Sequence, residues 1–318
     1  MQALKRLGID SFLLLLFAMV FLGVLLPARG AAADLLGQLT YWAVALLFFL
    51  HGAKLDPALV RAGLLNWRLQ GLSFAATYAV YPLLGLALAA VAGPWLGAAV
   101  TLGLLFLAVL PSTVQSSIAF TSIAGGNVPG AICAASLSNF AGILLTPLLV
   151  TLLLHQEGEV SLGSVLRIGT QIFLPFLLGQ LLRPRIGGVV ARHARLTLLV
   201  DRGSILLIVY AAFGAGTVSG LWSTTPPGVL LGLSGVILVL LALGMAAMAA
   251  AGRLFRLPAP DRAALFYCGS TKSLASGVPI ATALFSADQA GAIVLPVMIY
   301  HMTQLIVCAV LSRKPGAR

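Results

Sequence analysis

The 318-residue chain is 60% apolar and only 8% charged, and its mean hydropathy is +1.06. This composition excludes a soluble globular domain and predicts an all-α, polytopic membrane protein. The net charge of +11 does not indicate a nucleic-acid-binding protein, because the basic residues are dispersed between apolar spans and no RNA-binding or DNA-binding motif accompanies them.

Apolar runs close to the ~20 residues that cross a bilayer predict ten transmembrane helices. The first run follows Lys5 and Arg6 and resembles a secretory signal with Ala31 to Ala33 as a cleavage site. We favour a retained helix, because an even number of spans agrees with basic residues at both termini. The spans cover residues 11–28, 38–54, 70–92, 97–123, 128–154, 161–182, 200–220, 227–251, 258–286 and 288–312.

The basic residues lie almost entirely on one side of these spans, which predicts a cytoplasmic side that carries both termini and faces anionic lipid headgroups. The opposite side has only Arg29, while Arg167 lies near a span end and Lys272 lies inside a span. We therefore expect a multi-pass protein of the cell (inner) membrane. The residues on the basic side are Lys5, Arg6, Lys54, Arg61, Arg68, Arg183, Arg185, Arg192, Arg195, Arg202, Arg253, Arg256, Arg262, Arg313, Lys314 and Arg318.

Five spans precede the acidic loop His155 to Val160 and five follow it, so residues 11–154 and 161–312 form two halves of one membrane domain. An odd number of spans per half predicts that any structural repeat is inverted. The longest loops, Asp56 to Leu69 and Arg183 to Val200, are basic and are expected to form interfacial helices. Three cysteines inside spans, Cys133, Cys268 and Cys308, lack metal-ligand spacing and are expected to be packing residues.

A polar break interrupts the fourth span, in the segment LPSTVQSSIAFTSIAGGN from Leu110 to Asn127. Pro111 removes a backbone donor there, so freed carbonyls and nearby hydroxyls can replace water around a small cation. The alternative is that small polar residues only allow close helix packing. The candidate ion ligands are Thr113, Gln115, Ser116 and Ser117 on the fourth span and Ser136, Ser138 and Asn139 on the fifth, and Asn127 after the fourth span is a candidate substrate-binding residue.

A second break lies at the equivalent position of the other half, in the segment YCGSTKSLASGVPIATA from Tyr267 to Ala283. Two such breaks in corresponding positions indicate a binding site between inverted repeats. Lys272 lies inside this break, where a cation must be solvated by protein, water or an anion. Its ammonium could attract an anionic substrate, occupy the place of a coupling cation, carry a proton, or snorkel to an interface. Ser270, Ser273, Ser276 and, on the last span, His301 complete the candidate site.

Enzymatic patterns are weak in this chain. It has no paired intramembrane carboxylates, no metalloprotease motif and no Gly-rich phosphate loop. An intramembrane hydrolase built on a Ser-Lys pair is a distant alternative, and we predict a protein that is not an enzyme.

Three segments together carry a resemblance to a known family: Phe49 to Pro57 (FLHGAKLDP), the fourth-span break with the helix Ala131 to Pro147, and Phe266 to Ala281 (FYCGSTKSLASGVPIA). They resemble the bile acid:sodium symporter family over essentially the whole chain. The likeness is strongest to the branch that includes the vertebrate solute carrier family ten, member seven. It implies panel helices one, two, six and seven, core helices three to five and eight to ten, and crossing discontinuous helices four and nine.

The resemblance also implies candidate ligands. A first sodium site would use Ser116 and Ser117, with Ser136 and Asn139 from helix five. At the second sodium site, the positions that carry a Glu and a Gln in other members are Ser270 and Leu274 here, and Thr77 takes the place of a third polar ligand. Lys272 enters the same break, and a nearby cation without a carboxylate raises the cost of binding Na⁺.

We therefore expect a secondary transporter of a small or amphipathic organic anion, such as a bile-acid-like carboxylate or sulfonate, that works by alternating access. Na⁺ is a candidate coupling ion, and no other cofactor is expected. The alternatives are a sodium-independent or proton-coupled carrier, and a membrane regulator of ion homeostasis. The sequence does not fix the oligomeric state, and a monomer is compatible with it.

Overall fold

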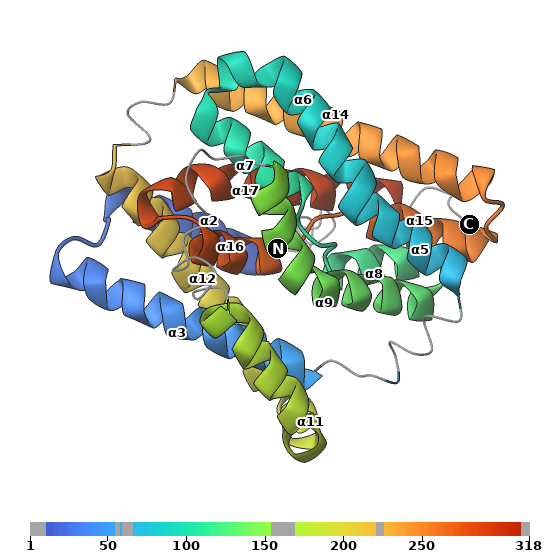
Figure 1. Ribbon diagram of the computed structural model, residues 1–318, viewed down its shortest axis with the longest axis horizontal. Helices are drawn as coiled ribbons and strands as arrows, with labels where there is room; N and C mark the ends of the chain where they lie inside the picture. The colour runs from blue at the N-terminus through green and yellow to red at the C-terminus, as the bar shows by residue number, and fades with distance from the viewer. Residues whose placement is uncertain (1–10, 55–57, 59–65, 154–168, 221–225, 313–318) are drawn as a thin grey trace.

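The computed structural model describes residues 11–54, 58, 66–153, 169–220 and 226–312, and their regular structure is helical throughout (Figure 1). This confirms the all-α prediction for the described ranges. The elements are α2 (Ser11–Leu25), α3 (Ala31–Lys54), α5 (Trp67–Ala75), the π-helical turn η1 (Ala76–Val80), α6 (Tyr81–Leu96), α7 (Ala98–Ala108), α8 (Gln115–Ile123), α9 (Val128–Leu153), the π-helical turn η2 (Gly169–Phe173), α11 (Leu174–Arg192), α12 (Ala194–Val218), α14 (Pro227–Leu254), α15 (Ala259–Ser270), α16 (Leu274–Leu284) and α17 (Ala287–Leu311).

Six helical stretches of the described chain are long and apolar enough to cross a membrane. Two shorter apolar helices, Leu14–Leu25 and Ala98–Ala108, accompany them. Apolar side chains also cover much of the outer surface, as a lipid-facing protein requires. The chain is therefore a multi-pass membrane protein. The six stretches are Ala31–Lys54, Trp67–Leu96, Val128–Leu153, Ala194–Val218, Pro227–Leu254 and Ala287–Leu311.

Both predicted interruptions are present. In the first, α7 ends at Ala108 and α8 begins at Gln115, with Pro111 between them. In the second, α15 ends at Ser270 and α16 begins at Leu274, and the backbone of Thr271 and Ser273 is extended. Ser273 caps α16, since its hydroxyl accepts a hydrogen bond from Ser276 N at 3.1 Å.

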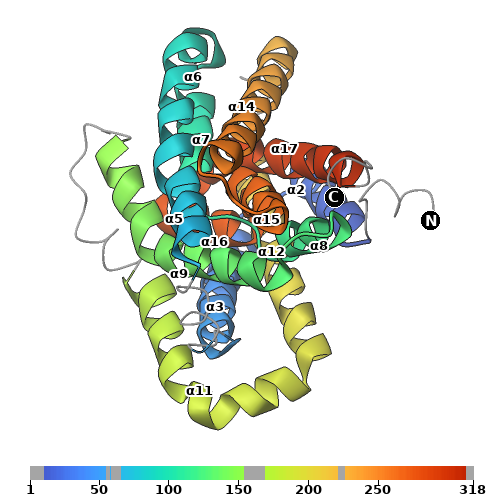
Figure 2. The same ribbon diagram turned by 90° about the vertical axis from the view of Figure 1, so that its right-hand side faces the viewer.

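The helices form two groups with the interrupted segments between them. α3 packs along α11 and α2 along α12, while α6 and α7 pack together and α14 packs on α6 and α15. Figure 2 shows α3 and α11 in the lower part of the view and α6 and α14 at the top, with α8, α15 and α16 at the middle level. α17 contacts both α7 and α12 and so connects the two groups.

The prediction that a loop from Arg183 to Val200 separates two spans is wrong. α11 continues to Arg192 and α12 begins at Ala194, so only His193 separates two helices. Hydropathy ends a span where charges begin, but Arg is a good helix former and exposed Arg side chains let a helix continue beyond the apolar region. The basic segment is thus helical, as the interfacial-helix prediction requires, without being a separate element.

Several sequence predictions concern residues outside the described ranges. They are the acidic loop 155–160, the start of the sixth span, most of the loop from Asp56 to Leu69, and the basic residues Lys5, Arg6, Arg61, Arg167, Arg313, Lys314 and Arg318. The three cysteines lie within described helices and are buried.

Candidate functional site

The two interruptions lie against each other and exchange hydrogen bonds. Ser273 N donates to the carbonyl oxygen of Pro111 at 2.8 Å. In return, Ser112 Oγ donates to the carbonyl oxygen of Cys268 at 2.5 Å, and Ser112 Oγ also lies 3.3 Å from Thr271 Oγ1. Segments about 160 residues apart in sequence therefore meet at their non-helical parts, as the two-break hypothesis requires.

Seven consecutive carbonyl groups of the first break, from Ala108 to Val114, all accept hydrogen bonds. A helix end leaves such carbonyls without intrahelical partners, and burial makes unpaired ones costly. Side chains supply most of the donors here. The donors are Lys272 Nζ for Ala108 and Leu110, Thr146 Oγ1 for Val109, Ser273 N for Pro111, Asn139 Nδ2 for Ser112, Ser117 Oγ for Thr113 and Val114, and also Ile118 N for Val114.

Lys272 extends from the second break into the first. Its ammonium donates to the carbonyl oxygens of Ala108 at 2.9 Å, Leu110 at 2.8 Å and Thr77 at 3.1 Å. It lies 4.4 Å from the centre of the Tyr81 ring, and the residue is 1% exposed. The amine does not emerge at an interface, so snorkelling is excluded.

The backbone of the second break is held by three side chains of other helices. Gln304 contacts Lys272 at two points: its Oε1 accepts from Lys272 N at 2.8 Å and its Nε2 donates to Lys272 O at 2.9 Å. The hydroxyls of Tyr81 and Tyr300 lie 2.9 and 2.8 Å from the carbonyl oxygen of Ser270 and 2.6 Å from each other. The break is therefore fixed in one conformation by buried polar contacts.

A cavity of about 720 Å³ opens beside the two breaks. Its polar wall comes from the break-flanking helices α8, α9, α16 and α17. Ser116 Oγ donates to Thr113 Oγ1 at 3.1 Å, and Asn139 Oδ1 accepts from Ser276 Oγ at 2.6 Å. The polar residues of this wall are Thr113, Gln115, Ser116, Ser136, Asn139, Ser273, Ser276 and His301.

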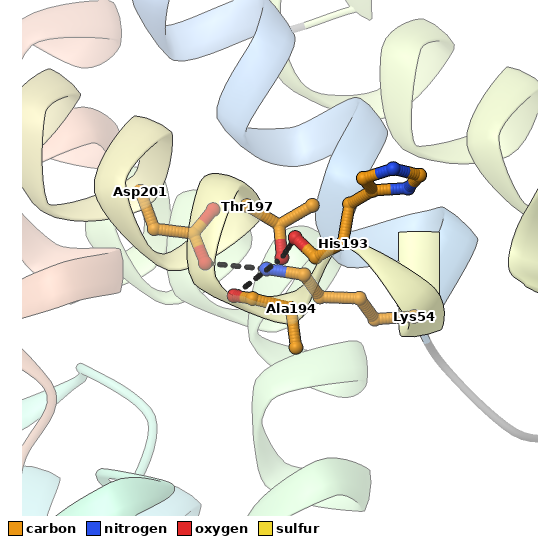
Figure 3. Close-up of polar contacts among 5 residues, drawn as sticks. All are labelled: Lys54, His193, Ala194, Thr197 and Asp201. Carbon is orange, nitrogen blue, oxygen red and sulfur yellow. Dashed lines mark hydrogen bonds and ion pairs between the residues drawn. The ribbon is translucent and has the colours of Figure 1, made fainter. Parts of the chain in front are cut away.

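The opposite wall is aromatic and basic and comes largely from α2, α3, α11 and α12. Lys54 Nζ pairs with Asp201 at 2.5 Å, and Figure 3 shows this pair beside Thr197, whose hydroxyl donates to carbonyls of the preceding turn. The guanidinium of Arg202 lies 5.0 Å from the Phe12 ring. Lys54 and Arg202 thus place two cationic side chains at the cavity, and the first of them is paired with Asp201. The residues of this wall are Phe12, Phe48, His51, Lys54, Phe176, Leu198, Asp201, Arg202 and Ile205.

The structure separates the predicted site residues into two sets. Thr113, Gln115, Ser116, Ser136, Asn139, Ser273, Ser276 and His301 line the cavity. Thr77, Ser117, Asn127, Ser138, Ser270 and Lys272 do not. Of the predicted sodium ligands, Ser117 is fully buried and its hydroxyl bonds the chain of its own helix.

Asn127, a candidate substrate-binding residue, caps α9. Its Oδ1 accepts from Gly130 N at 2.8 Å, and its Nδ2 donates to Asp261 Oδ1 at 2.6 Å. Asn66 Nδ2 donates to the other oxygen of the same carboxylate at 2.9 Å. These contacts hold the first turns of α5, α9 and α15 together.

Sequence reasoning missed the aromatic and basic wall and the role of Gln304. The wall residues come from strongly apolar helices. In such a helix, the sequence does not distinguish a Phe that lines a cavity from a Phe that faces lipid. In the sequence, Lys54 and Arg202 indicate only the orientation of the chain in the membrane. Their position near the ends of apolar runs was the available signal.

Comparison with known proteins identifies the family. Residues 10–315 match the SBF-like CPA transporter family. The chain belongs to this family. It is therefore a transport protein and not an enzyme, which confirms the resemblance to bile acid:sodium symporters.

Curated relatives span nearly the whole chain. It is 47% identical over 311 residues to the protein PA2026 of Pseudomonas aeruginosa, covering 97% of this chain and 93% of the relative. It is 43% identical over 307 residues to YfeH of Escherichia coli, which carries the provisional name of a symporter, covering 96% and 92%. The "Sodium/bile acid cotransporter 7" of Rattus norvegicus is 27% identical over 330 residues, covering 98% and 94%.

Proposed function

We propose that this chain is a secondary transporter that carries a small, amphipathic organic anion by alternating access through the cavity at the two breaks. The single observation that carries the proposal is that this cavity combines aromatic side chains and the cationic Lys54 and Arg202 with a group of hydroxyl side chains beside the breaks. A volume of about 720 Å³ is in the range of ligand pockets, roughly 300–1,000 Å³. An apolar body with one carboxylate or sulfonate fits such a division, and the relatives named as bile acid cotransporters are consistent with it.

The anionic character of the cargo follows from the charges at the cavity. Lys54, which pairs with Asp201, and Arg202 both line it, so the guanidinium adds a positive charge to this wall. Burial beside aromatic rings strengthens the attraction of this charge for an anion. A cation would meet repulsion at the same wall.

We infer that the chain crosses the membrane ten times as two inverted five-helix halves. The ten spans would be α2, α3, α5 to α6, α7 to α8, α9, α11 with η2, α12, α14, α15 to α16, and α17. The support is that the interrupted helices are fourth and ninth in this order. α2, α3, α11 and α12 would form a panel that moves against the remaining core, in the cell membrane, with both termini cytoplasmic.

Two coupling ions fit the cavity. The hydroxyls of Thr113, Ser116 and Ser136 are the oxygen ligands that Na⁺ takes, and the relatives' names contain sodium. A proton-coupled mechanism would use His51 and His301, which also line the cavity. Uptake into proteoliposomes driven by a Na⁺ gradient at constant pH, or by a pH gradient without Na⁺, separates these two mechanisms.

A thermal-unfolding screen of the purified protein tests the cargo. We expect steroid carboxylates and sulfonates to raise the melting temperature, and an uncharged steroid of the same skeleton to have little effect, because a ligand stabilises what it binds. Arg202→Gln should weaken binding of the anion about tenfold, the equivalent of about 1.4 kcal/mol. Arg195→Gln removes the same charge from the exposed side of α12, outside the cavity, and should leave binding unchanged. Equal stabilisation by the uncharged steroid would contradict the proposal.

A further inference from the structure

The ammonium of Lys272 occupies a complete site of three backbone carbonyls. Thr77, Ala108 and Leu110 each place an oxygen 2.8–3.1 Å from Nζ. A lysine ammonium has three hydrogens, so each carbonyl accepts one. A neutral amine would have only two hydrogens and would direct its lone pair at the third oxygen. Three acceptors around Nζ therefore favour the ammonium over the neutral amine.

The chain makes each of these carbonyls available by a local irregularity. In the π-helical turn η1, Tyr81 N donates to the carbonyl of Ala76, which leaves the carbonyl of Thr77 free for another donor. At the end of α7, Ser112 N would continue the helix onto the carbonyl of Ala108. It donates instead to Ser138 Oγ at 2.9 Å. Leu110 lies in the break itself, where no helix continues.

An aromatic face lies against the same position. The Tyr81 ring centre lies 4.4 Å from Nζ, which is the range of a cation–π contact. The hydroxyl of this ring is fixed by Ser270 O and Tyr300. Converging carbonyl oxygens are also what ion-conducting proteins use to replace the hydration shell of a monovalent metal ion.

The site is separate from the cavity that would hold the organic anion. Ser273 and Ser276 line the cavity, but Lys272 is 1% exposed and does not. Its backbone is fixed at both the N–H and the carbonyl by Gln304. To bind an anion, the ammonium would have to give up its hydrogen bonds to the three carbonyls. This geometry therefore does not favour direct binding of the substrate by Lys272.

We propose that the Lys272 ammonium is a tethered cation: it permanently fills a carbonyl site that would otherwise take a monovalent metal ion such as Na⁺. The amine arrives from the second break and its ligands come from the first break and η1, so the charge also fastens the two halves together. This inference rests on the proposed function. If the chain is a transporter, transport needs no metal ion at the position of the ammonium, whatever ion is bound at the cavity.

Removing the amine and supplying a free cation tests the proposal. Lys272→Ala leaves three buried carbonyls unpaired beside the space of the lost side chain, and its melting temperature should fall. Na⁺ or methylammonium should then raise that temperature in a saturable manner, since a cation that binds only the folded state stabilises it. Choline chloride at the same ionic strength should not. Lys272→Met fills most of the space with an apolar chain, so it should be destabilised without any recovery.

The wild-type protein is the reference for every salt, because any cation that binds elsewhere acts on both proteins. A larger rise in melting temperature for Lys272→Ala than for wild type and Lys272→Met supports the proposal. An equal response of all three proteins to Na⁺ and methylammonium overturns it. This readout needs no organic anion, so failure of the anion screen would refute the proposed cargo and leave the tethered cation standing.

A second measurement keeps the test decisive if Lys272→Ala does not fold in any of these salts. Lys5, Lys54 and Lys314 can each be replaced by Arg, which leaves Lys272 as the single lysine of the chain. The ¹⁵Nζ signal of that protein in nanodiscs should be that of an ammonium and should not change when Na⁺ is added. A neutral amine, or a signal that Na⁺ shifts, would overturn the proposal.

Discussion

Gly179 and Gly52 allow α11 and α3 to pack backbone against backbone, and replacing Gly179 by Ala should separate these helices. A Cβ atom added at Gly179 would lie 2.0 Å from the carbonyl oxygen of Phe49, and one added at Gly52 would lie 2.1 Å from that of Phe176. The contact is reciprocal, with a Gly of each helix facing a carbonyl of the other. Small residues at such positions are typical of close helix packing in membranes.

The expected loss of stability follows from this geometry. A Cβ contact below 3.0 Å must relax, so α3 and α11 have to move apart by about 1 Å near Gly179. Overpacking of this kind costs roughly 1–3 kcal/mol. Ala is a better helix former than Gly by up to about 1 kcal/mol, which offsets part of the cost. We expect Gly179→Ala to lose about 1–2 kcal/mol of unfolding free energy.

Gly188 on the same helix provides the matched control, because a Cβ atom added there meets nothing within 4 Å. Gly188→Ala should therefore gain up to about 1 kcal/mol, opposite in sign to Gly179→Ala. Thermal unfolding in one detergent measures both. Gly179→Ala should also weaken the binding of an organic anion, since α3 carries Lys54 and Phe48 and α11 carries Phe176 at the cavity. If the two variants are equally stable, the packing argument is refuted.

Substitutions at two further positions, Asp261 and Gln304, test the polar contacts that position the breaks. Asp261→Ala removes the carboxylate that joins Asn66 and Asn127 and should cost about 1–3 kcal/mol of unfolding free energy. Asp261→Asn should cost less, and equal melting temperatures for Asp261→Ala and wild type would contradict this assignment. Gln304→Ala leaves the N–H and the carbonyl of Lys272 unpaired and should cost at least about 2 kcal/mol. Gln304→Glu keeps the acceptor and loses the donor, so its melting temperature should lie between those of wild type and Gln304→Ala. Equal melting temperatures for all three proteins would show that the contact has no structural role.

The interruptions could be predicted from the sequence because their causes are local. Pro111 has no N–H to donate, and hydroxyls placed after it in an apolar run compete for the backbone. A lysine at membrane depth likewise has few stable environments, so Lys272 marks its segment as a candidate polar site. The hydroxyls that line the cavity, such as Ser116 and Ser276, lie close to these two signals in the chain.

The partners of the breaks could not be predicted in the same way. The ligands of Lys272 are backbone carbonyls, which every residue possesses, and their availability depends on a π-helical turn and on a hydrogen bond from Ser112 N to Ser138. Asn127 belongs to the same polar stripe in sequence as the cavity residues, but the turn before α9 directs it to Asp261. The aromatic wall of the cavity requires the packing of α2, α3, α11 and α12 against the breaks, which no local pattern encodes.

The contacts at the breaks also indicate which part of the molecule moves as a unit. Lys272, Ser273 and Ser112 join the two interruptions directly, and Tyr300 and Gln304 attach them to α17. Opening any of these contacts would expose unpaired buried groups, each at a cost of about 1–3 kcal/mol. On the wall formed by α2, α3, α11 and α12, the ion pair of Lys54 and Asp201 joins α3 to α12, while α12 also packs on α16 and α17. Under the proposed alternating-access mechanism, we therefore expect the polar network at the breaks to move intact.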